Sequence, residues 1–271
     1  MAKVRLDNLL YAQGLVESRE KARAMVIAGE VIVNGTRIDK PGTKFEENAQ
    51  LQLEPRTLKY VSRGGFKLEG AIQDLHIDFI NKVVLDVGAS TGGYTDCALQ
   101  NGAAKVFAVD VGYGQLAWTL RNDPRVKVFE RTNIRYFMLE QLGELVDTIT
   151  MDVSFISTRL IYPVITDLLK DDGEIICLIK PQFEAGKDKV GKKGVVKDPA
   201  VHRAVLLNCI SGAHAAGLNC VGISYSHIKG PQGNIEYFIH LKKRTEPLEH
   251  IVEMVGEVVL KAHTILEGCI K

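Results

Sequence analysis

The sequence lacks features that would assign it to several common classes of protein. It has no run of roughly 18 apolar residues, the length of a membrane-spanning helix, and no signal-peptide core follows the start MAKVRLDNLL. We therefore expect a cytoplasmic protein that does not engage a membrane. No Cys-x-x-Cys pair occurs, so the cysteines are expected to be buried, reduced thiols: Cys97, Cys177, Cys209, Cys220 and Cys269.

An excess of either charge is also missing. The 34 lysines and arginines against 33 acidic residues leave a net charge of +1, so any basic surface for nucleic acid must be local. The seven histidines show no spacing with carboxylates or thiols that is typical of a metal site, and no metal is expected. With 46% apolar residues over 271 positions, the chain has material for one large and one small globular domain.

The first sixty residues differ in pattern from the rest. Apolar residues at helical spacing open this segment, and Ser18 precedes a second short helix expected over residues 19–28. Strands are expected at 31–33, 36–38 and 50–54, with a tight turn at Asn34-Gly35. The pattern predicts a small α+β domain over residues 1–55, followed by a linker at 56–61.

From about residue 62, helical and strand patterns alternate. Such alternation predicts an α/β domain with a mainly parallel sheet that is covered on both faces. Seven strands are expected, at 83–87, 105–110, 126–130, 146–152, 174–180, 219–227 and 234–243. The gap between the last two is too short for a crossover helix, so they should form an antiparallel hairpin. A final helix over 248–266 would pack on the sheet or on a second subunit, which fits a monomer or a homodimer.

The turn after the first of these strands carries the strongest ligand signal. It reads Asp86-Val87-Gly88-Ala89-Ser90-Thr91-Gly92-Gly93-Tyr94, and glycines at such a turn let the backbone approach a ligand closely. Asp110, which ends the second strand, stands where an acid accepts the ribose hydroxyls of a nucleoside-bearing cofactor. Ser90 replaces the second glycine of a dinucleotide site, and Asp86 would repel a phosphate but suits the cationic methionine end of S-adenosylmethionine. The pattern favours this methyl donor over a dinucleotide and over a turn without a ligand.

Four ionisable residues stand at strand ends or beside apolar positions: Lys67, Asp152, Lys180 and Glu236. Each alone could also be a solvated side chain. Together they suggest a mechanism, because a ribose hydroxyl needs a base or a cationic environment before it becomes a nucleophile. A buried lysine can serve as that base, carboxylates can orient it, and a second lysine can position the substrate.

These residues resemble the Lys–Asp–Lys–Glu tetrad of the FtsJ-type ribose 2′-O-methyltransferases, and the resemblance covers about residues 60–243. It implies a Rossmann-like methyltransferase domain over residues 62–271, S-adenosylmethionine as cofactor, and Lys180 as the base. The residues expected to bind the cofactor are Asp86, Gly88, Ala89, Ser90, Gly92, Gly93, Tyr94, Asp110, Asn133 and Asp152.

The front segment, residues 5 to about 53, resembles a small RNA-binding domain shared by a small-subunit ribosomal protein, pseudouridine synthases and tyrosyl-tRNA synthetases. The two domains together resemble the TlyA-type rRNA methyltransferases, a family also called hemolysins. The resemblance implies 2′-O-methylation of cytidine in ribosomal RNA, in one or both subunits. Some members carry an Arg-x-Trp-Val segment in the linker, and this chain lacks its tryptophan.

A lysine-rich loop supports an RNA partner independently. Residues 180–197 contain six lysines, two acids and three glycines, a local charge of +4 on a flexible segment that could clamp an RNA backbone. A solvated loop is the alternative. The residues expected to contact RNA, by gripping phosphates rather than reading bases, are Arg5, Arg19, Lys21, Arg23, Arg63, Lys187, Lys189, Lys192 and Lys193.

Two functions from other classes stay open. An RNA-binding ribosome-assembly factor with little catalysis would share both domains and differ only in failing to transfer a methyl group. A membrane-active hemolysin would need a spanning segment or a strongly basic amphipathic helix. The helix expected at 248–266 is instead acidic at its start.

Overall fold

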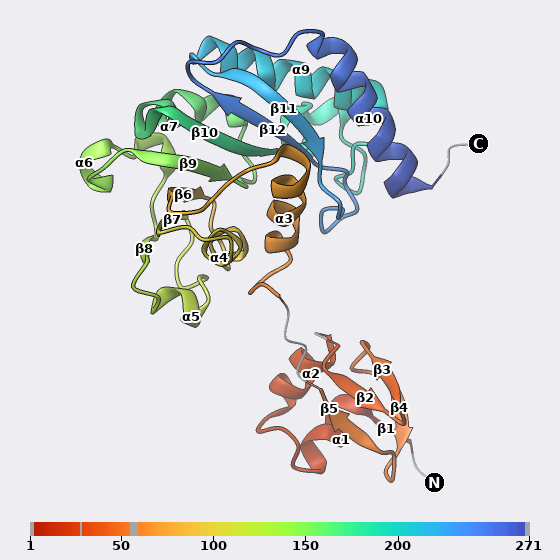
Figure 1. The fold of residues 1–271 in the computed structure, drawn as a ribbon. Coiled ribbons are helices and arrows are strands. Elements are labelled where there is room, and N and C mark those ends of the chain that lie inside the picture. Colours follow the sequence, from red (N-terminus) through yellow and green to blue (C-terminus); the bar gives the residue numbers. More distant parts are fainter. Residues whose placement is uncertain (1–2, 28, 55–58, 269–271) are drawn as a thin grey trace. The chain divides into compact units, whose positions relative to one another are not determined.

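The computed structural model describes residues 3–27, 29–54 and 59–268. The chain divides into two compact units, Met1–Lys59 and Tyr60–Lys271 (Figure 1). Most of the predicted linker falls on residues 55–58, which lie outside the described residues, as does Cys269. The other four cysteines are buried free thiols, as predicted.

The smaller unit holds two short helices and two small antiparallel sheets, with strand orders β1-β4 and β3-β2-β5. Ser18 precedes the second helix, where its Oγ accepts the backbone N–H of Lys21 at 3.1 Å. Asn34 and Gly35 have φ values of 49° and 78°, the geometry of a two-residue hairpin. The elements are β1 (Lys3–Arg5), α1 (Leu6–Ala12), α2 (Arg19–Ile27), β2 (Val31–Val33), β3 (Thr36–Ile38), β4 (Lys44–Glu46) and β5 (Leu51–Leu53). The sequence did not predict β1 and β4, because each has only one apolar residue in three, whereas the Asn34-Gly35 turn indicated β2 and β3.

The larger unit is built on one seven-stranded sheet in the order β11-β12-β10-β9-β6-β7-β8. Strands β10, β9, β6, β7 and β8 pair in parallel, and β12 pairs antiparallel with both β10 and β11. The mainly parallel sheet and its C-terminal hairpin were predicted and are confirmed. The strands are β6 (Val83–Val87), β7 (Lys105–Val109), β8 (Val126–Phe129), β9 (Val146–Met151), β10 (Leu169–Ile179), β11 (Asn219–Tyr225) and β12 (Tyr237–Lys242).

Two strand bounds differ from the prediction by more than two residues. β10 begins five residues early, at Leu169, with a register shift before Glu174. Glu236 was predicted inside the last strand but stands immediately before β12.

Helices cover both faces of this sheet, and Figure 1 shows α3 and α4 on the opposite side from α9 and α10. Side chains of each strand alternate between the faces. On β6, Leu85 and Val87 join the core under α7, α9 and α10, while Val84 joins the core under α3 and α4. The helices and 3-10 turns are α3 (Gly64–Leu75), α4 (Gly93–Gln100), α5 (Trp118–Arg121), η1 (Ile134–Tyr136), α6 (Leu139–Leu142), η2 (Thr158–Leu160), α7 (Tyr162–Leu168), α8 (Pro181–Glu184), η3 (Lys187–Lys189), α9 (Pro199–Ala215) and α10 (Ile251–Glu267). The predicted final helix is therefore α10, which packs on α9 and β11.

Asp86 is a carboxylate inside this core. It is 1% exposed, and its two oxygens accept the hydroxyls of Thr95 on α4 at 2.7 Å and Thr150 on β9 at 3.0 Å. These bonds join three elements of the larger unit around β6. Burial raises the pKa of Asp86 from 3.8 to about 6, although the two threonine hydroxyls act in the opposite direction.

Ionisation of Asp86 should therefore lower the free energy of unfolding relative to the protonated form. Because its folded-state pKa lies above the unfolded value, its stabilising contribution is complete below about pH 4 and is lost as the pH rises through about 6. The Asp86→Asn variant lacks this dependence. We expect its free energy of unfolding, relative to wild type, to rise by about 3 kcal/mol between pH 4 and pH 7. Urea unfolding at several pH values measures the difference, with Asp167→Asn on the exposed side of α7 as control. A difference that does not change with pH would contradict this account of Asp86.

Candidate functional site

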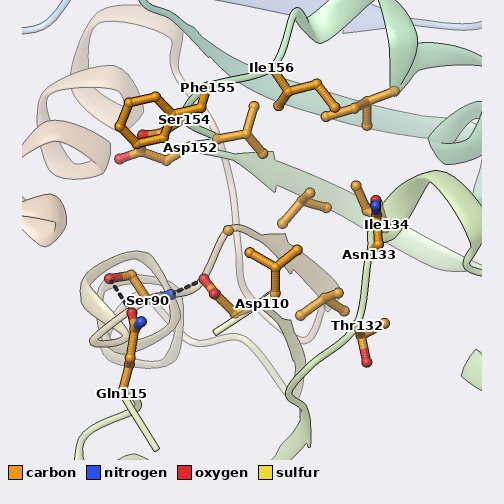
Figure 2. Close-up of a pocket in the computed structure, with 16 residues that line it drawn as sticks. Ser90, Asp110, Gln115, Thr132, Asn133, Ile134, Asp152, Ser154, Phe155 and Ile156 are labelled. Atoms are coloured by element: carbon orange, nitrogen blue, oxygen red, sulfur yellow. Dashed lines mark hydrogen bonds between the residues drawn. The ribbon is translucent and has the colours of Figure 1, made fainter. Parts of the chain in front are cut away.

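Two cavities open at the carboxyl ends of the parallel strands, the edge where open α/β sheets bind ligands. The first has a volume of about 340 Å³ and lies where β6, β7 and β9 end (Figure 2). Ser90, Asp110 and Asn133 supply polar groups to its lining, and Ile134 and Ile156 are among its apolar residues. The cavity thus combines apolar walls with a few fixed polar groups.

The turn from β6 to α4 passes very close to neighbouring backbone at two glycines. Gly88 has a φ of 86°, and a Cβ there would lie 2.6 Å from the carbonyl oxygen of Asp152. A Cβ at Gly93 would lie 2.7 Å from the backbone nitrogen of Gly65 on α3. Neither place admits a side chain without a backbone shift. The two glycines therefore allow the turn, the end of β9 and helix α3 to approach one another.

Asp110 follows β7, and its carboxylate is held from two sides. Oδ2 accepts the backbone N–H of Ser90 at 2.8 Å, and Oδ1 accepts that of Gly112 at 2.7 Å. Each carboxylate oxygen keeps a further lone pair, so this side chain can still accept two hydroxyl groups from a ligand. Asn133 is fixed similarly, since its Oδ1 accepts the N–H of Arg135 at 3.1 Å.

Most residues predicted to bind the cofactor line one of the two cavities. Gly88, Ser90, Asp110, Asn133 and Asp152 line the first, and Ala89, Gly93 and Tyr94 line the second. Gly92 lines neither and packs against Leu120 of α5.

Asp86 requires a correction. The predicted contact of its carboxylate with a cationic ligand is wrong in this structure, because the side chain lines neither cavity and is enclosed by Thr95 and Thr150. The alternation along β6 directs it into the core beneath the turn rather than toward the sheet edge.

The second cavity, of about 310 Å³, adjoins the first. Arg63, Lys67, Lys180 and Lys229 line it, and because Lys67 and Lys180 are paired with carboxylates, its excess positive charge comes from Arg63 and Lys229. Asp152 belongs to the lining of both cavities. A group bound in one cavity would therefore meet a group bound in the other beside this carboxylate.

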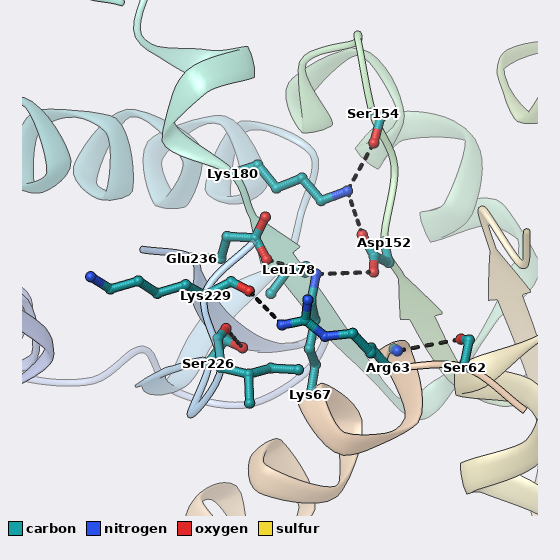
Figure 3. A network of polar contacts seen from close by, with 12 residues as sticks. Ser62, Arg63, Lys67, Asp152, Ser154, Leu178, Lys180, Ser226, Lys229 and Glu236 are labelled. Atoms are coloured by element: carbon teal, nitrogen blue, oxygen red, sulfur yellow. Dashed lines mark hydrogen bonds and ion pairs between the residues drawn. The ribbon is translucent and has the colours of Figure 1, made fainter. Parts of the chain in front are cut away.

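The four residues predicted to form a catalytic tetrad lie together around Asp152 (Figure 3). Lys180 Nζ lies 2.6 Å from Asp152 Oδ1 and donates to Ser154 Oγ at 2.9 Å. Lys67 Nζ lies 3.8 Å from Asp152 Oδ2 and 2.7 Å from Glu236 Oε2.

Ammonium and carboxylate groups thus alternate in the order Lys180–Asp152–Lys67–Glu236. Their side chains are mostly buried, from 1% exposed for Glu236 to 17% for Asp152. Buried charges persist only when they are paired, so each of these four side chains depends on its neighbours to remain charged.

The residues predicted to contact RNA are all exposed, and they are divided between the two units of the chain. Arg63 stands at the second cavity and donates to the carbonyl of Lys229 at 3.3 Å. Lys187 lines a third cavity, while Lys189, Lys192 and Lys193 extend along the same loop. Arg5, Arg19, Lys21 and Arg23 belong to the smaller unit. There Arg5 pairs with Asp7 at 2.6 Å and lowers the pKa of that carboxyl.

Sequence reasoning missed one conspicuous residue, Phe155. Its side chain is 90% exposed and its φ is 63°, a conformation that costs a non-glycine residue about 1–3 kcal/mol. Its ring contacts that of Phe183 at a centroid distance of 4.8 Å, and it lines both the first and the third cavity. The only signal in the sequence is an aromatic residue three positions after the strand-end Asp152.

Comparison with known proteins identifies relatives of both units. Residues 60–243 match the FtsJ-like methyltransferase family, and residues 4–51 match the S4 domain. YqxC of Bacillus subtilis, named as a candidate rRNA methyltransferase, is 49% identical over 98% of this chain and 96% of its own. The 16S/23S rRNA (cytidine-2′-O)-methyltransferase TlyA of Mycobacterium tuberculosis is 42% identical over 90% of this chain and 91% of its own.

A solved structure from Streptococcus thermophilus, named as a candidate hemolysin, matches with a TM-score of 0.77 and 43% identity over 98% of both chains. Within the described ranges of the present chain, no helix has the length and apolar character needed to cross a membrane. The family match covers most of the chain and includes every residue of both strand-end cavities. The chain therefore belongs to the FtsJ-like methyltransferase family, with a segment that matches the S4 domain at its front.

Proposed function

We propose that this chain transfers the methyl group of S-adenosylmethionine to the 2′-hydroxyl of a cytidine in ribosomal RNA. The observation that carries the proposal is the alternating chain Lys180–Asp152–Lys67–Glu236 at the junction of two cavities. The relative from M. tuberculosis, an rRNA (cytidine-2′-O)-methyltransferase, supports the choice of substrate. So does the S4 match over residues 4–51.

The first cavity has the chemistry to hold S-adenosylmethionine. The open lone pairs of Asp110 suit the two ribose hydroxyls, and apolar residues such as Val111 and Ile134 suit the adenine ring. Gly88 and Asp152 line both cavities, so a ligand in the first cavity can extend toward the second beside them. When bound, the cofactor supplies an electrophilic methyl group on a sulfonium centre.

Lys180 is the residue we assign as the base. To act as a base, the Lys180 ammonium must first release a proton to solvent, and the neutral amine then has two N–H groups and one lone pair. Asp152 and Ser154 occupy two of its directions, at 2.6 and 2.9 Å, which leaves one for a ligand in the second cavity. There the lone pair would take the proton of the ribose 2′-hydroxyl as its oxygen becomes nucleophilic. Lys67, held by Glu236, would stabilise the negative charge that develops on that oxygen.

We assign binding of the RNA backbone to basic side chains that are exposed or partly exposed and take no part in the Lys180–Asp152–Lys67–Glu236 network. Arg63 and Lys229 border the second cavity, and the lysines of residues 187–193 extend from the third. The basic residues of α2 would add contacts from the smaller unit. Since ribosomal RNA or a ribosomal subunit is the proposed substrate, we propose activity in the cytoplasm, as a monomer or a homodimer.

The Lys180→Met variant should keep cofactor binding and lose catalysis. Removing a general base slows transfer by about 10²–10⁴-fold, while the first cavity, which Lys180 does not line, stays intact. The measurement is transfer of labelled methyl to ribosomal subunits from unmodified cells, with alkaline cleavage to locate a protected 2′-oxygen. Calorimetry with S-adenosylhomocysteine tests cofactor binding, and Lys261→Met on the exposed side of α10 is the control.

Full activity of Lys180→Met would refute its role as base. Cofactor binding by the wild type without transfer to any subunit or whole ribosome would favour an RNA-binding assembly factor. Leakage of dye from anionic liposomes would favour the hemolysin alternative.

Phe155→Ala should weaken substrate binding with little effect on stability. An exposed aromatic ring beside the site is suited to stack on a nucleobase, a contact worth about 1–3 kcal/mol per base, so KM for RNA should rise by at least about fivefold. Because the ring is 90% exposed, the melting temperature should barely change. Steady-state kinetics measure the change, with the exposed Leu260→Ala on α10 as control. An unchanged KM would remove Phe155 from substrate binding.

A further inference from the structure

The segment from Ser154 to Thr158 contributes to the lining of all three cavities around the proposed site. Ser154 accepts a hydrogen bond from Lys180, Phe155 lines the first and third cavities, and Ile156 lines the first. We propose that Glu184, which none of the comparisons assigns, is the positioning residue that fixes this segment. The inference rests on the proposed methyl transfer for its effect on activity.

Glu184 ends the single turn of α8 and directs its carboxylate at the far end of this segment. Its Oε2 accepts the Ser157 hydroxyl at 2.7 Å, and its Oε1 accepts the backbone N–H of Thr158 at 2.7 Å and the Thr158 hydroxyl at 2.9 Å. All three donors come from two adjacent residues. Hydrogen bonds to an ionised acceptor are about twice as strong as neutral ones. Thr158 is only 2% exposed, so water competes little for these bonds.

The position of Glu184 in the chain gives these bonds their importance. Lys180 immediately precedes α8, so the proposed base and Glu184 stand at the two ends of one helical turn. Hydrogen bonds therefore join the segment to this turn at two places. Lys180 bonds to Ser154, and Glu184 bonds to residues 157 and 158. Between these two sets of hydrogen bonds, the ring of Phe155 contacts that of Phe183 in the same turn.

The backbone conformation of Phe155 explains why the hydrogen bonds to Glu184 are needed. Its positive φ is an unfavourable conformation for an aromatic residue, and such a conformation persists only where the surroundings determine it. The bonds to Glu184 fix the backbone three residues further on. Without them, the segment could relax and move both the Phe155 ring and the acceptor of Lys180.

Glu184 acts through these contacts and not on the substrate. It lines none of the three cavities around the site, and both of its carboxylate oxygens already accept hydrogen bonds from residues 157 and 158. Its loss should therefore disturb RNA binding and catalysis more than cofactor binding, which depends chiefly on the β6–α4 turn and Asp110.

The first test compares Glu184→Ala, Glu184→Gln and the exposed control Glu257→Ala on α10. We expect Glu184→Ala to lower kcat/KM for RNA at least tenfold while the dissociation constant of S-adenosylhomocysteine changes less than threefold. The glutamine retains an acceptor oxygen for Thr158, so it should restore kcat/KM to within about threefold of wild type. Equal activity of wild type and Glu184→Ala would overturn the inference, as would equal losses in RNA and cofactor binding.

The second test asks whether Glu184 acts through residues 157 and 158. In a Ser157→Ala, Thr158→Val background the hydroxyl donors are gone, so adding Glu184→Ala should lower kcat/KM by much less than it does in wild type. A fully additive loss would show that Glu184 acts elsewhere.

The third test needs no enzymatic activity. The Thr158 amide donates directly to Glu184, so its hydrogen exchange should accelerate at least tenfold in Glu184→Ala and remain at the wild-type rate in Glu257→Ala. If wild type transfers no methyl group, the proposed function fails, and this exchange rate still decides whether Glu184 holds the segment. An unchanged rate would overturn the inference even in an active enzyme.

Discussion

The position of Asp152 is the constraint on which the rest of the site depends. Its carboxylate pairs with Lys180 on one side and approaches Lys67 on the other, while its carbonyl oxygen leaves room only for glycine at position 88. The parallel pairing of β9 with β6, with Met151 opposite Val87, places it there. Removing one partner from a buried pair costs roughly 3–5 kcal/mol, because the remaining charge is left without compensation. The sheet therefore fixes the position of Asp152, and the Asp152 carboxylate in turn positions Lys180 and Lys67.

Much of this architecture could be predicted from the sequence because buried parallel strands appear as short apolar runs between helical patterns. The runs at 83–87 and 175–179 are examples, and both strands occur as central members of the sheet. Periodicity says nothing about which strands are neighbours. The grouping of Lys67, Asp152, Lys180 and Glu236 came instead from a family resemblance, in which order and context stand for contacts between distant parts of the chain.

The sequence analysis erred where the outcome depends on the direction of a side chain or on contacts between distant parts of the chain. Asp86 lies next to the glycine turn in sequence, but the pleat of β6 turns its carboxylate toward Thr95 and Thr150, away from the cavity. Phe155 follows a strand end in a segment without periodicity. Its exposure and its positive φ become visible only once Phe183 and Glu184 are placed against that segment.

The balance of charge explains how reactive groups can be buried in a protein for which we propose an RNA substrate. Lys67 and Lys180 are matched by Asp152 and Glu236, so the four groups together carry no net charge and attract no phosphate on balance. Attraction for an RNA backbone must therefore come from basic residues that are not paired with carboxylates in this network. The exposed lysines of residues 187–193 are examples. Because these lysines lie outside the charge network, on a loop of which Lys187 lines the third cavity, they could contact a polyanion without altering the pairing that orients Lys180. A net charge of only +1 is thus compatible with an RNA substrate, since the excess positive charge is needed at the rim alone.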